Sequence, residues 1–261
     1  MKRFYSFLLL SSLAAMVFYA CKKNVLPVPY TYVGQQASLK INYASAYKAN
    51  PAVQLKVNDE RVSTAISYPF PYPGGGLNTN GNSTPDYFAV NAGSNKITIA
   101  IPKLGTNTDS VVLYNTTVSV DAGKYFTAHI ADTTANTQTV VVSEDVASPD
   151  SGFSKYRFVN LLPDQTALDL YFGTTKLASS IPYKGTSPYF TIVSTTAAQW
   201  AIRPAGALTT TAALTTYPTG TTINTVPNQR VLTVYARGYS SIATTMTTDP
   251  RRVQLSLFYN R

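Results

Sequence analysis

Cys21 carries the only thiol in the chain, and its position decides which chemistry is open to it. Lys2 and Arg3 give the chain a positive start, and an apolar run over residues 7–18, interrupted by two serines, follows. Ala20 then places a small residue directly before the cysteine. This order is typical of a secretory signal, and the run is too short to cross a bilayer. We therefore expect residues 1–20 to be a signal peptide that is removed.

The segment resembles the signals of bacterial lipoproteins, in which the cysteine at the cut is acylated and becomes the new N-terminus. The resemblance implies lipidation of Cys21 and a lipid-anchored location in the bacterial cell envelope, at the outer membrane, with the periplasmic or surface face left open. Two or more buried acyl chains give stable anchoring, so the membrane itself is an expected partner. The alternative is an ordinary cleaved signal that leaves a free thiol.

Side chains suited to catalysis are scarce. His129 is the only histidine, and it alternates with apolar residues over 125–130, which predicts a strand residue rather than a catalytic base. No serine lies in a nucleophile-elbow context, and zinc would need several His or Cys ligands. We therefore expect no enzyme activity, no cofactor and no metal. A hydrolase with two carboxylates that meet only in the fold is the minor alternative.

The twelve carboxylates are placed mostly at turns. Four of them are predicted to be turn formers, namely Asp59, Glu60, Asp121 and Asp164. Three others cluster in the middle of the chain, namely Glu144, Asp145 and Asp150. We interpret this cluster as a solvated acidic linker, with a calcium site as the alternative because calcium prefers oxygen ligands.

Aromatic and amide side chains gather around one long loop. They form the candidate ligand-binding loop, whose residues are Tyr68, Phe70, Tyr72, Asn78, Asp86 and Tyr87. Aromatic faces combined with amides are what sugar recognition uses, so a glycan or protein partner is the hypothesis. The alternative is that tyrosine is simply a good strand residue and Pro-Tyr-Pro a stiff turn.

The composition indicates the elements that must position these residues. The chain holds 19 Tyr, 11 Phe, 16 Pro and 14 Gly among many Thr and Val, which favours short strands joined by turns. With one cysteine there can be no internal disulfide, so packing alone must supply stability. The formal charge is +9, and removal of Lys2 and Arg3 leaves +7. Because the basic residues are scattered singly, we expect no nucleic-acid partner.

Alternating patterns then place the strands. Residues 21–36 are predicted to be an extended tether, held open by two prolines. Leu39, Ile41 and Tyr43 share one face of a strand, with Lys40 and Asn42 on the other. Similar patterns cover 53–57, 97–101 and 125–130, and the sequence after Asn58-Asp59 predicts a further strand over 62–66.

The second half of the chain repeats the first. Residues 52–68 align without a gap on 167–183, residues 87–88 on 189–190, and residues 120–127 on 226–233. A period near 110 residues is the size of a domain. We therefore predict two β-sandwich domains, 37–148 and 152–261, with the boundary in 143–153 and a barrel as the alternative.

One loop separates the copies. Between Tyr68 and Tyr87 the first copy has 18 residues, whereas five lie between Tyr183 and Tyr189 in the second. The extra length is either drift in a tolerant loop or a binding site.

The second copy resembles the bacterial domain-of-unknown-function family 4397. Its opening carries the likeness, with Tyr156 to Asn160, Pro163-Asp164 and Asp169, followed by a later segment at 200–206. The first copy has Gln54 where Asp169 stands and lacks the Pro-Asp pair. The resemblance implies a β-sandwich of cell-surface type and no established reaction. The short strands and closely spaced turns of each copy are what favour two tandem immunoglobulin-like antiparallel β-sandwiches.

These observations favour a non-catalytic, lipid-anchored envelope protein that acts as a binding or adhesion module. A structural spacer or assembly component of the envelope is the alternative.

Overall fold

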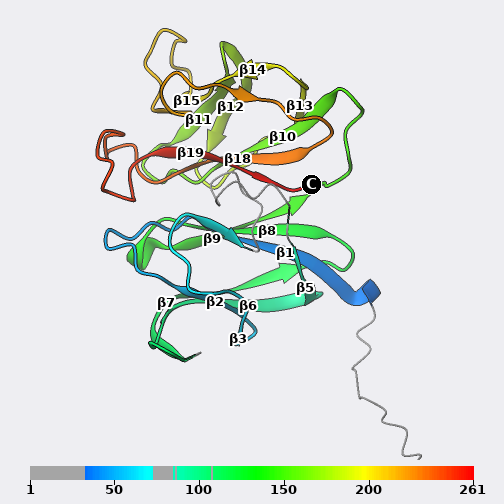
Figure 1. Ribbon diagram of the computed structural model, residues 1–261, viewed down its shortest axis with the longest axis vertical. Helices are drawn as coiled ribbons and strands as arrows, with labels where there is room; N and C mark the ends of the chain where they lie inside the picture. Colours follow the sequence, from blue (N-terminus) through cyan, green and yellow to red (C-terminus); the bar gives the residue numbers. More distant parts are fainter. Residues whose placement is uncertain (1–32, 73–84, 86, 107) are drawn as a thin grey trace, which may run out of the picture. The chain divides into compact units, whose positions relative to one another are not determined.

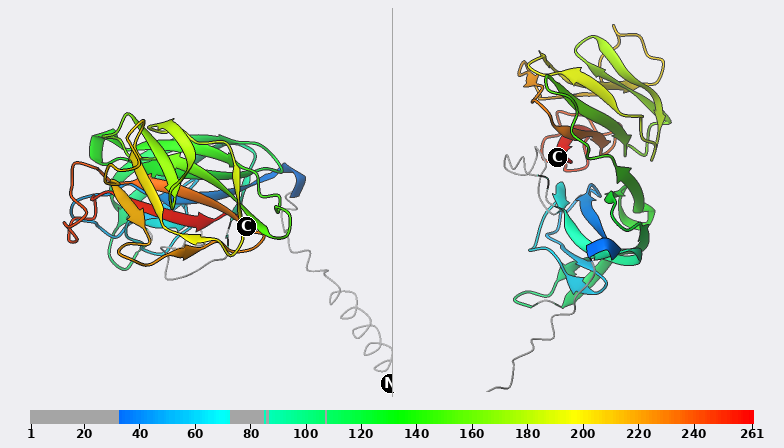
Figure 2. Two further views of the ribbon diagram at one scale, coloured as in Figure 1. Left: turned by 90° about the horizontal axis from the view of Figure 1, so that it is seen from above. Right: turned by 90° about the vertical axis from the view of Figure 1, so that its right-hand side faces the viewer.

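The fold is all-β in the computed structural model, which describes residues 33–72, 85, 87–106 and 108–261. The described chain contains β-strands and two short 3-10 turns, η1 (Val33–Gln35) and η2 (Thr134–Asn136). It forms two sandwich-like repeats, β1 to β9 and β10 to β19, within the compact unit Val33–Arg261 (Figures 1 and 2). Cys21 and the predicted signal and tether up to residue 32 lie outside the described residues.

The first repeat contains two sheets. The first has the order β4-β1-β8-β9, with β5 also paired to β1, and the second has the order β3-β2-β6-β7. The strands are β1 (Gln36–Tyr43), β2 (Gln54–Val57), β3 (Glu60–Arg61), β4 (Phe70–Tyr72), β5 (Phe88–Asn91), β6 (Gly93–Pro102), β7 (Asp109–Val120), β8 (Tyr125–Ala131) and β9 (Gln138–Glu144).

The second repeat follows the same plan. Its sheets have the orders β13-β10-β18-β19 and β12-β11-β15-β16, and a small third sheet pairs β14 with β17. The strands are β10 (Phe153–Asn160), β11 (Ala167–Phe172), β12 (Thr175–Pro182), β13 (Phe190–Val193), β14 (Ala197–Ala198), β15 (Trp200–Pro204), β16 (Thr215–Tyr217), β17 (Asn224–Thr225), β18 (Val231–Arg237) and β19 (Gln254–Tyr259).

Each repeat departs from a purely antiparallel sandwich at one strand pair. β1 runs parallel to β8, and β10 runs parallel to β18, whereas the other named pairs are antiparallel. Strands so far apart in the chain are not joined by a hairpin, so nothing forces them to run in opposite directions. The immunoglobulin-like form of the sandwich stays a prediction.

Matching strand pairs and turns support the alignment of the two copies. Val53 bridges Ile66 in the first copy, and the aligned Leu168 pairs with Ile181 in the second. The turns before β8 and β18 also match, because Gly123 and the aligned Gln229 both have a positive φ. The predicted strand over 62–66 is interrupted. Val62 donates to the Leu55 carbonyl and Ile66 bridges Val53, but the Ser63 hydroxyl accepts the backbone N–H of Leu55 and residues 63–65 leave the ladder.

Each repeat has its own hydrophobic core. The core of the first repeat includes Leu39, Ile41 and Leu55, and that of the second includes Trp200, Leu168 and Leu257. A third buried cluster draws on both repeats, and its members are Ala44, Ala131, Val142, Val159, Leu161, Tyr235 and Phe258. The outer face of one sheet in each repeat is therefore buried against the other repeat.

The outer face of β1 is buried, although its alternating pattern resembles that of a strand with one solvent-exposed face. Lys40 and Asn42 do lie on the face opposite Leu39 and Ile41, but both are fully buried rather than solvated. His129 is a strand residue of β8 and is buried on the same face, with its Nδ1 3.0 Å from the side-chain amide of Asn42. The sheet is covered on both sides.

Equivalent residues of the two repeats make equivalent contacts across this interface. The Lys40 ammonium lies over the Tyr87 ring at 4.6 Å and donates to the Tyr259 carbonyl. Its counterpart Arg157 lies over the Tyr189 ring at 4.0 Å and donates to the Ser143 carbonyl at 2.8 Å.

The two tyrosine hydroxyls extend the same relation. Tyr87 donates to Asn260 at 3.3 Å, and Tyr189 donates to Glu144 at 2.8 Å. Glu144 pairs with β8 opposite Tyr125, and Asn260 holds the corresponding place opposite Val231. The interface thus has the self-complementary character of a two-fold dimer interface, formed here within one chain.

No helix among the described residues is long and apolar enough to cross a membrane.

Candidate functional site

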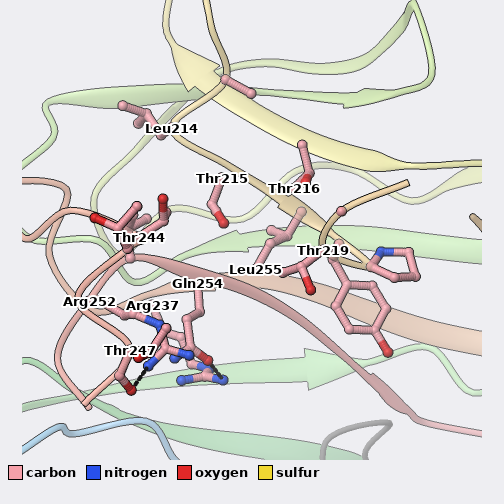
Figure 3. Close-up of a pocket in the computed structure, with 16 residues that line it drawn as sticks. Leu214, Thr215, Thr216, Thr219, Arg237, Thr244, Thr247, Arg252, Gln254 and Leu255 are labelled. Atoms are coloured by element: carbon pink, nitrogen blue, oxygen red, sulfur yellow. Dashed lines mark hydrogen bonds between the residues drawn. The ribbon is translucent and has the colours of Figure 1, made fainter. Parts of the chain in front are cut away.

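The second repeat carries an open groove of about 670 Å³ between two segments that are distant in sequence (Figure 3). One wall comes from β16 and the residues that follow it, and the other from the segment 244–247 and the start of β19. Seven of the residues that line the groove carry a hydroxyl group, namely Thr215, Thr216, Tyr217, Thr219, Thr244, Thr245 and Thr247. The floor is apolar, because Val253 and Leu255 are buried there.

Two arginines line the same groove. Figure 3 shows Arg237 and Arg252 near Thr247, away from Thr219. Arg252 donates from Nη1 to the Thr247 carbonyl at 2.8 Å. Arg237 is only 2% exposed and donates to the Ser256 hydroxyl at 2.8 Å and to the Gln254 side-chain oxygen. The groove therefore offers many hydroxyls along its length and positive charge at one end.

A glycine brings the arginine-bearing segments together. Gly238 has φ +86°, a conformation that favours glycine, and a Cβ there would clash with the carbonyl oxygens of Arg251 and Arg252. Tyr239 donates its backbone N–H to Arg251 at 2.8 Å just beyond this contact. Because no side chain intervenes at position 238, Arg252 can lie against the strand end that carries Arg237.

Asp164 holds the beginning of the segment that connects β18 to β19. Its two carboxylate oxygens accept the backbone N–H groups of Ser240 and Ser241 at 3.0 and 2.8 Å. Asp164 lies in a turn after β10, as predicted, and its carboxylate also satisfies the backbone at 240–241. The Pro163-Asp164 motif therefore supports the segment that leads to the groove wall.

Asp169 of the same motif set is also structural. It is fully buried and accepts Lys176 Nζ at 2.6 Å, Ser180 N at 2.7 Å and Gly206 N at 3.2 Å. Although burial opposes ionisation, these donors hold the pKa of Asp169 below its usual range. It ties three segments of the second repeat together and leaves no free oxygen for substrate chemistry.

A second hollow of about 670 Å³ lies in the first repeat. Its lining runs from Pro51 and Ala52 to residues 101–106, with Arg61 and Lys103 at its borders. It is built mainly from aliphatic side chains and lacks the row of hydroxyls, so the groove of the second repeat is the stronger candidate.

Two of the aromatic residues predicted to bind a ligand, Tyr68 and Tyr87, make contacts within the chain. Tyr68 is 5% exposed, and its hydroxyl accepts a hydrogen bond from Arg237 at 2.5 Å. The Tyr87 ring lies beneath Lys40 and meets the edge of Tyr125 with centroids 5.1 Å apart. These two tyrosines therefore join the repeats.

The other four residues of the candidate ligand-binding loop provide no further evidence for a site. Phe70 and Tyr72 lie in β4, where their backbones pair with Tyr43 and Ile41. Asn78 and Asp86 lie outside the described residues. A ligand-binding role for the loop stays a prediction.

The acidic cluster at the middle of the chain is not a solvated linker throughout. Glu144 is 6% exposed and accepts Tyr189 and Asn260. Asp145 is exposed but pairs with Lys155 at 2.8 Å and accepts the Ala147 N–H, and the Lys155 hydrogen bond is the main cause of its lowered pKa. The solvated interpretation is therefore wrong for Glu144, because the interface between the repeats covers it. Within the described chain no group of three or more His, Cys, Asp or Glu side chains could hold a metal ion.

Sequence reasoning missed the groove. Its walls come from threonine-rich stretches at 209–222 and 244–248, which alternate poorly and give no strand signal. The signal available in the sequence was the repetition of threonine in these two stretches. Their meeting depended on the antiparallel neighbours of β16 and β19, which no local pattern reveals.

Fold and groove together define a tandem β-sandwich protein with one open, hydroxyl-lined groove in its second repeat. Protein-family models match residues 40–171 and 154–256 to the family described as "Domain of unknown function (DUF4397)". The chain therefore belongs to the DUF4397 family and carries it in tandem.

No curated protein matches the chain. Among solved structures, "The Bacillus anthracis TIE protein" aligns over 66% of this chain and 29% of that chain, with 8% sequence identity and a TM-score of 0.22. The chain thus spans less than a third of that protein's length.

Proposed function

We propose that this is a non-catalytic, lipid-anchored protein of the bacterial cell envelope that binds a saccharide in the groove of its second repeat. The observation that carries the proposal is the row of threonine hydroxyls along an open groove with an apolar floor. Sugars present hydroxyls at their edges and C–H groups on their faces, and such a groove offers partners for both. The first repeat holds the membrane-facing end of the chain, and its interface with the second repeat supports the groove.

Two alternatives stay open beside binding. A spacer or assembly component of the envelope would need no groove, and a hydrolase would need acid and base groups in it. The residues that line the groove include no carboxylate and no histidine. This lining supports binding over hydrolysis.

The proposal is tested on a glycan array with the unit Val33–Arg261, which is compact by itself. We expect it to retain at least one oligosaccharide. The double variant Thr244→Val/Thr247→Val should weaken that binding about thirty-fold, because each of the two lost hydrogen bonds is worth about 1 kcal/mol and valine keeps the shape. The control is Thr191→Val, at an exposed position of β13 outside the groove. No retained glycan, or equal binding by the double variant, would contradict the proposal and favour the spacer.

The anchor has its own test. Cys21→Ser removes the thiol that would be acylated, so the variant should incorporate no labelled fatty acid and should leave the membrane fraction. Radiolabelled palmitate incorporation and membrane partitioning in a bacterial host measure both effects. A variant that partitions like the parent would contradict lipidation at Cys21.

A further inference from the structure

The groove contains a buried positive charge that no carboxylate of the described chain neutralises. Arg237 is 2% exposed, and its three nitrogens donate to Ser256, Tyr68 and Gln254. The Tyr68 ring also lies 4.9 Å from the guanidinium carbon. All of these partners are neutral at pH 7. Burying a cation without an opposite charge is unfavourable, so the site gains from an anion brought by something else.

A second guanidinium adds to this charge. Arg252 lines the same groove, and its guanidinium donates to a neutral carbonyl, that of Thr247. The nearest carboxylate in sequence is Asp249, which is held by Arg251 at 2.7 and 3.0 Å. Those bonds lower the pKa of Asp249 to about 2, so its charge is already matched. Two arginines thus share one end of the groove without an ion pair to any described residue.

Arginine recognises oxyanions through two parallel N–H groups, which suits a carboxylate or a sulfate. Arg252 and Arg237 both line the groove, Arg252 half-buried and Arg237 buried. Both charges therefore attract an anion to this end of the groove. The threonines extend away from this end along the walls (Figure 3). The groove therefore has a charged end for an acidic group and a neutral length for hydroxyls.

We infer that the ligand of this groove is an acidic saccharide whose oxyanion, a carboxylate or a sulfate, binds at Arg252 above Arg237. The inference rests on the proposed function, because it specifies the chemical class of the saccharide. A neutral sugar would satisfy the threonines and leave the two guanidinium groups without a counter-charge.

The test compares three small probes that differ in charge, namely methyl β-glucuronide, glucose 6-sulfate and methyl β-glucoside. Each is titrated into ¹⁵N-labelled Val33–Arg261 and followed by amide chemical shifts. At least one acidic probe should bind about ten-fold more tightly than the glucoside, with the largest shifts at residues 244–252. The stronger acidic probe identifies carboxylate or sulfate as the preferred group.

Arg252→Gln should reduce the acidic probe's affinity to within two-fold of the glucoside and leave glucoside binding unchanged. Arg230→Gln makes the same charge change at an exposed position outside the groove and should have no effect. Equal binding of acidic and neutral probes, or a preference that survives Arg252→Gln, would overturn the acidic specificity while leaving the saccharide proposal standing. Binding by none of the three would overturn both.

Discussion

Replacing Phe258 by alanine is expected to lower the free energy of unfolding by about 3–5 kcal/mol, the usual cost of removing a fully buried phenylalanine. Phe258 lies on the outer face of β19 and is fully buried by the other repeat. Its ring centroid is 5.3 Å from that of Tyr235 and 5.8 Å from that of His129, and the Lys40 ammonium lies 4.8 Å away. If the two repeats were independent, this side chain would be exposed and its loss nearly neutral.

Urea denaturation of Val33–Arg261 measures this effect with two probes. Trp200, the only tryptophan, is buried in the core of the second repeat, so its fluorescence reports that repeat alone. Circular dichroism reports both repeats, and the two transitions of the parent should coincide. Phe153→Ala is the matched control, because Phe153 is 39% exposed and its loss should cost only about 1–2 kcal/mol. Separate transitions in the parent, together with a small cost for Phe258→Ala, would show that the repeats fold independently.

Acidification is expected to destabilise the protein through His129. Burial is the main cause that lowers the pKa of His129 from 6.5 to about 3, and the charges of Arg157 and Lys40 add to it. Because the unfolded chain binds this proton more readily than the folded one, the stabilisation is complete above pH 6.5 and is lost as the pH falls toward 3. Between pH 7 and pH 4 the loss is on the order of 3 kcal/mol, since each pKa unit corresponds to about 1.4 kcal/mol.

The contribution of His129 is isolated by comparison with His129→Gln. Carboxylates also titrate at the acidic end of this range, but they do so in both proteins. The free energy of unfolding of the parent, minus that of the variant, should therefore fall with decreasing pH from 6.5 to 4. A difference that stays constant across this range would mean that His129 is hydrated or already protonated in the folded protein.

The sequence predicted the repeat and the inner faces of the strands well, for a clear physical reason. Apolar residues recur at every second position in β1, β2 and β6, and this pattern alone identifies the side that meets the core. The ungapped alignment of the two copies predicted a repeated unit, and the matching pairs Val53 to Ile66 and Leu168 to Ile181 agree with it.

The outer faces could not be predicted in this way. Period-2 alternation shows that Lys40, Asn42 and His129 share a face, but it says nothing about what covers that face. Here a second copy of the same sheet covers it, and pairs such as Lys40 with Tyr87 and Arg157 with Tyr189 make the polar surfaces compatible. The aromatic residues Tyr68 and Tyr87 were likewise predicted to meet a ligand, whereas the structure places them in this interface.

The groove escaped prediction for a related reason. Arg237 and Arg252 are fifteen residues apart in the printed sequence, and the positive φ of Gly238 lets their backbones approach. A sequence pattern would detect a run of basic residues with aromatic residues between them, and neither arginine lies in one. Arg252 does follow Arg251, but this pair stands alone. The threonines of the two walls come together only through the pairing of β16 and β19 with their neighbours.

The most direct test of the central claim is a crystal structure of Val33–Arg261 with the best-bound oligosaccharide from the array. The account predicts ligand density along the groove between residues 215–219 and 244–247, with its acidic group within hydrogen-bond distance of Arg252. Density at the loop between Tyr68 and Tyr87, or at the hollow of the first repeat, with an empty groove in the second, would contradict it.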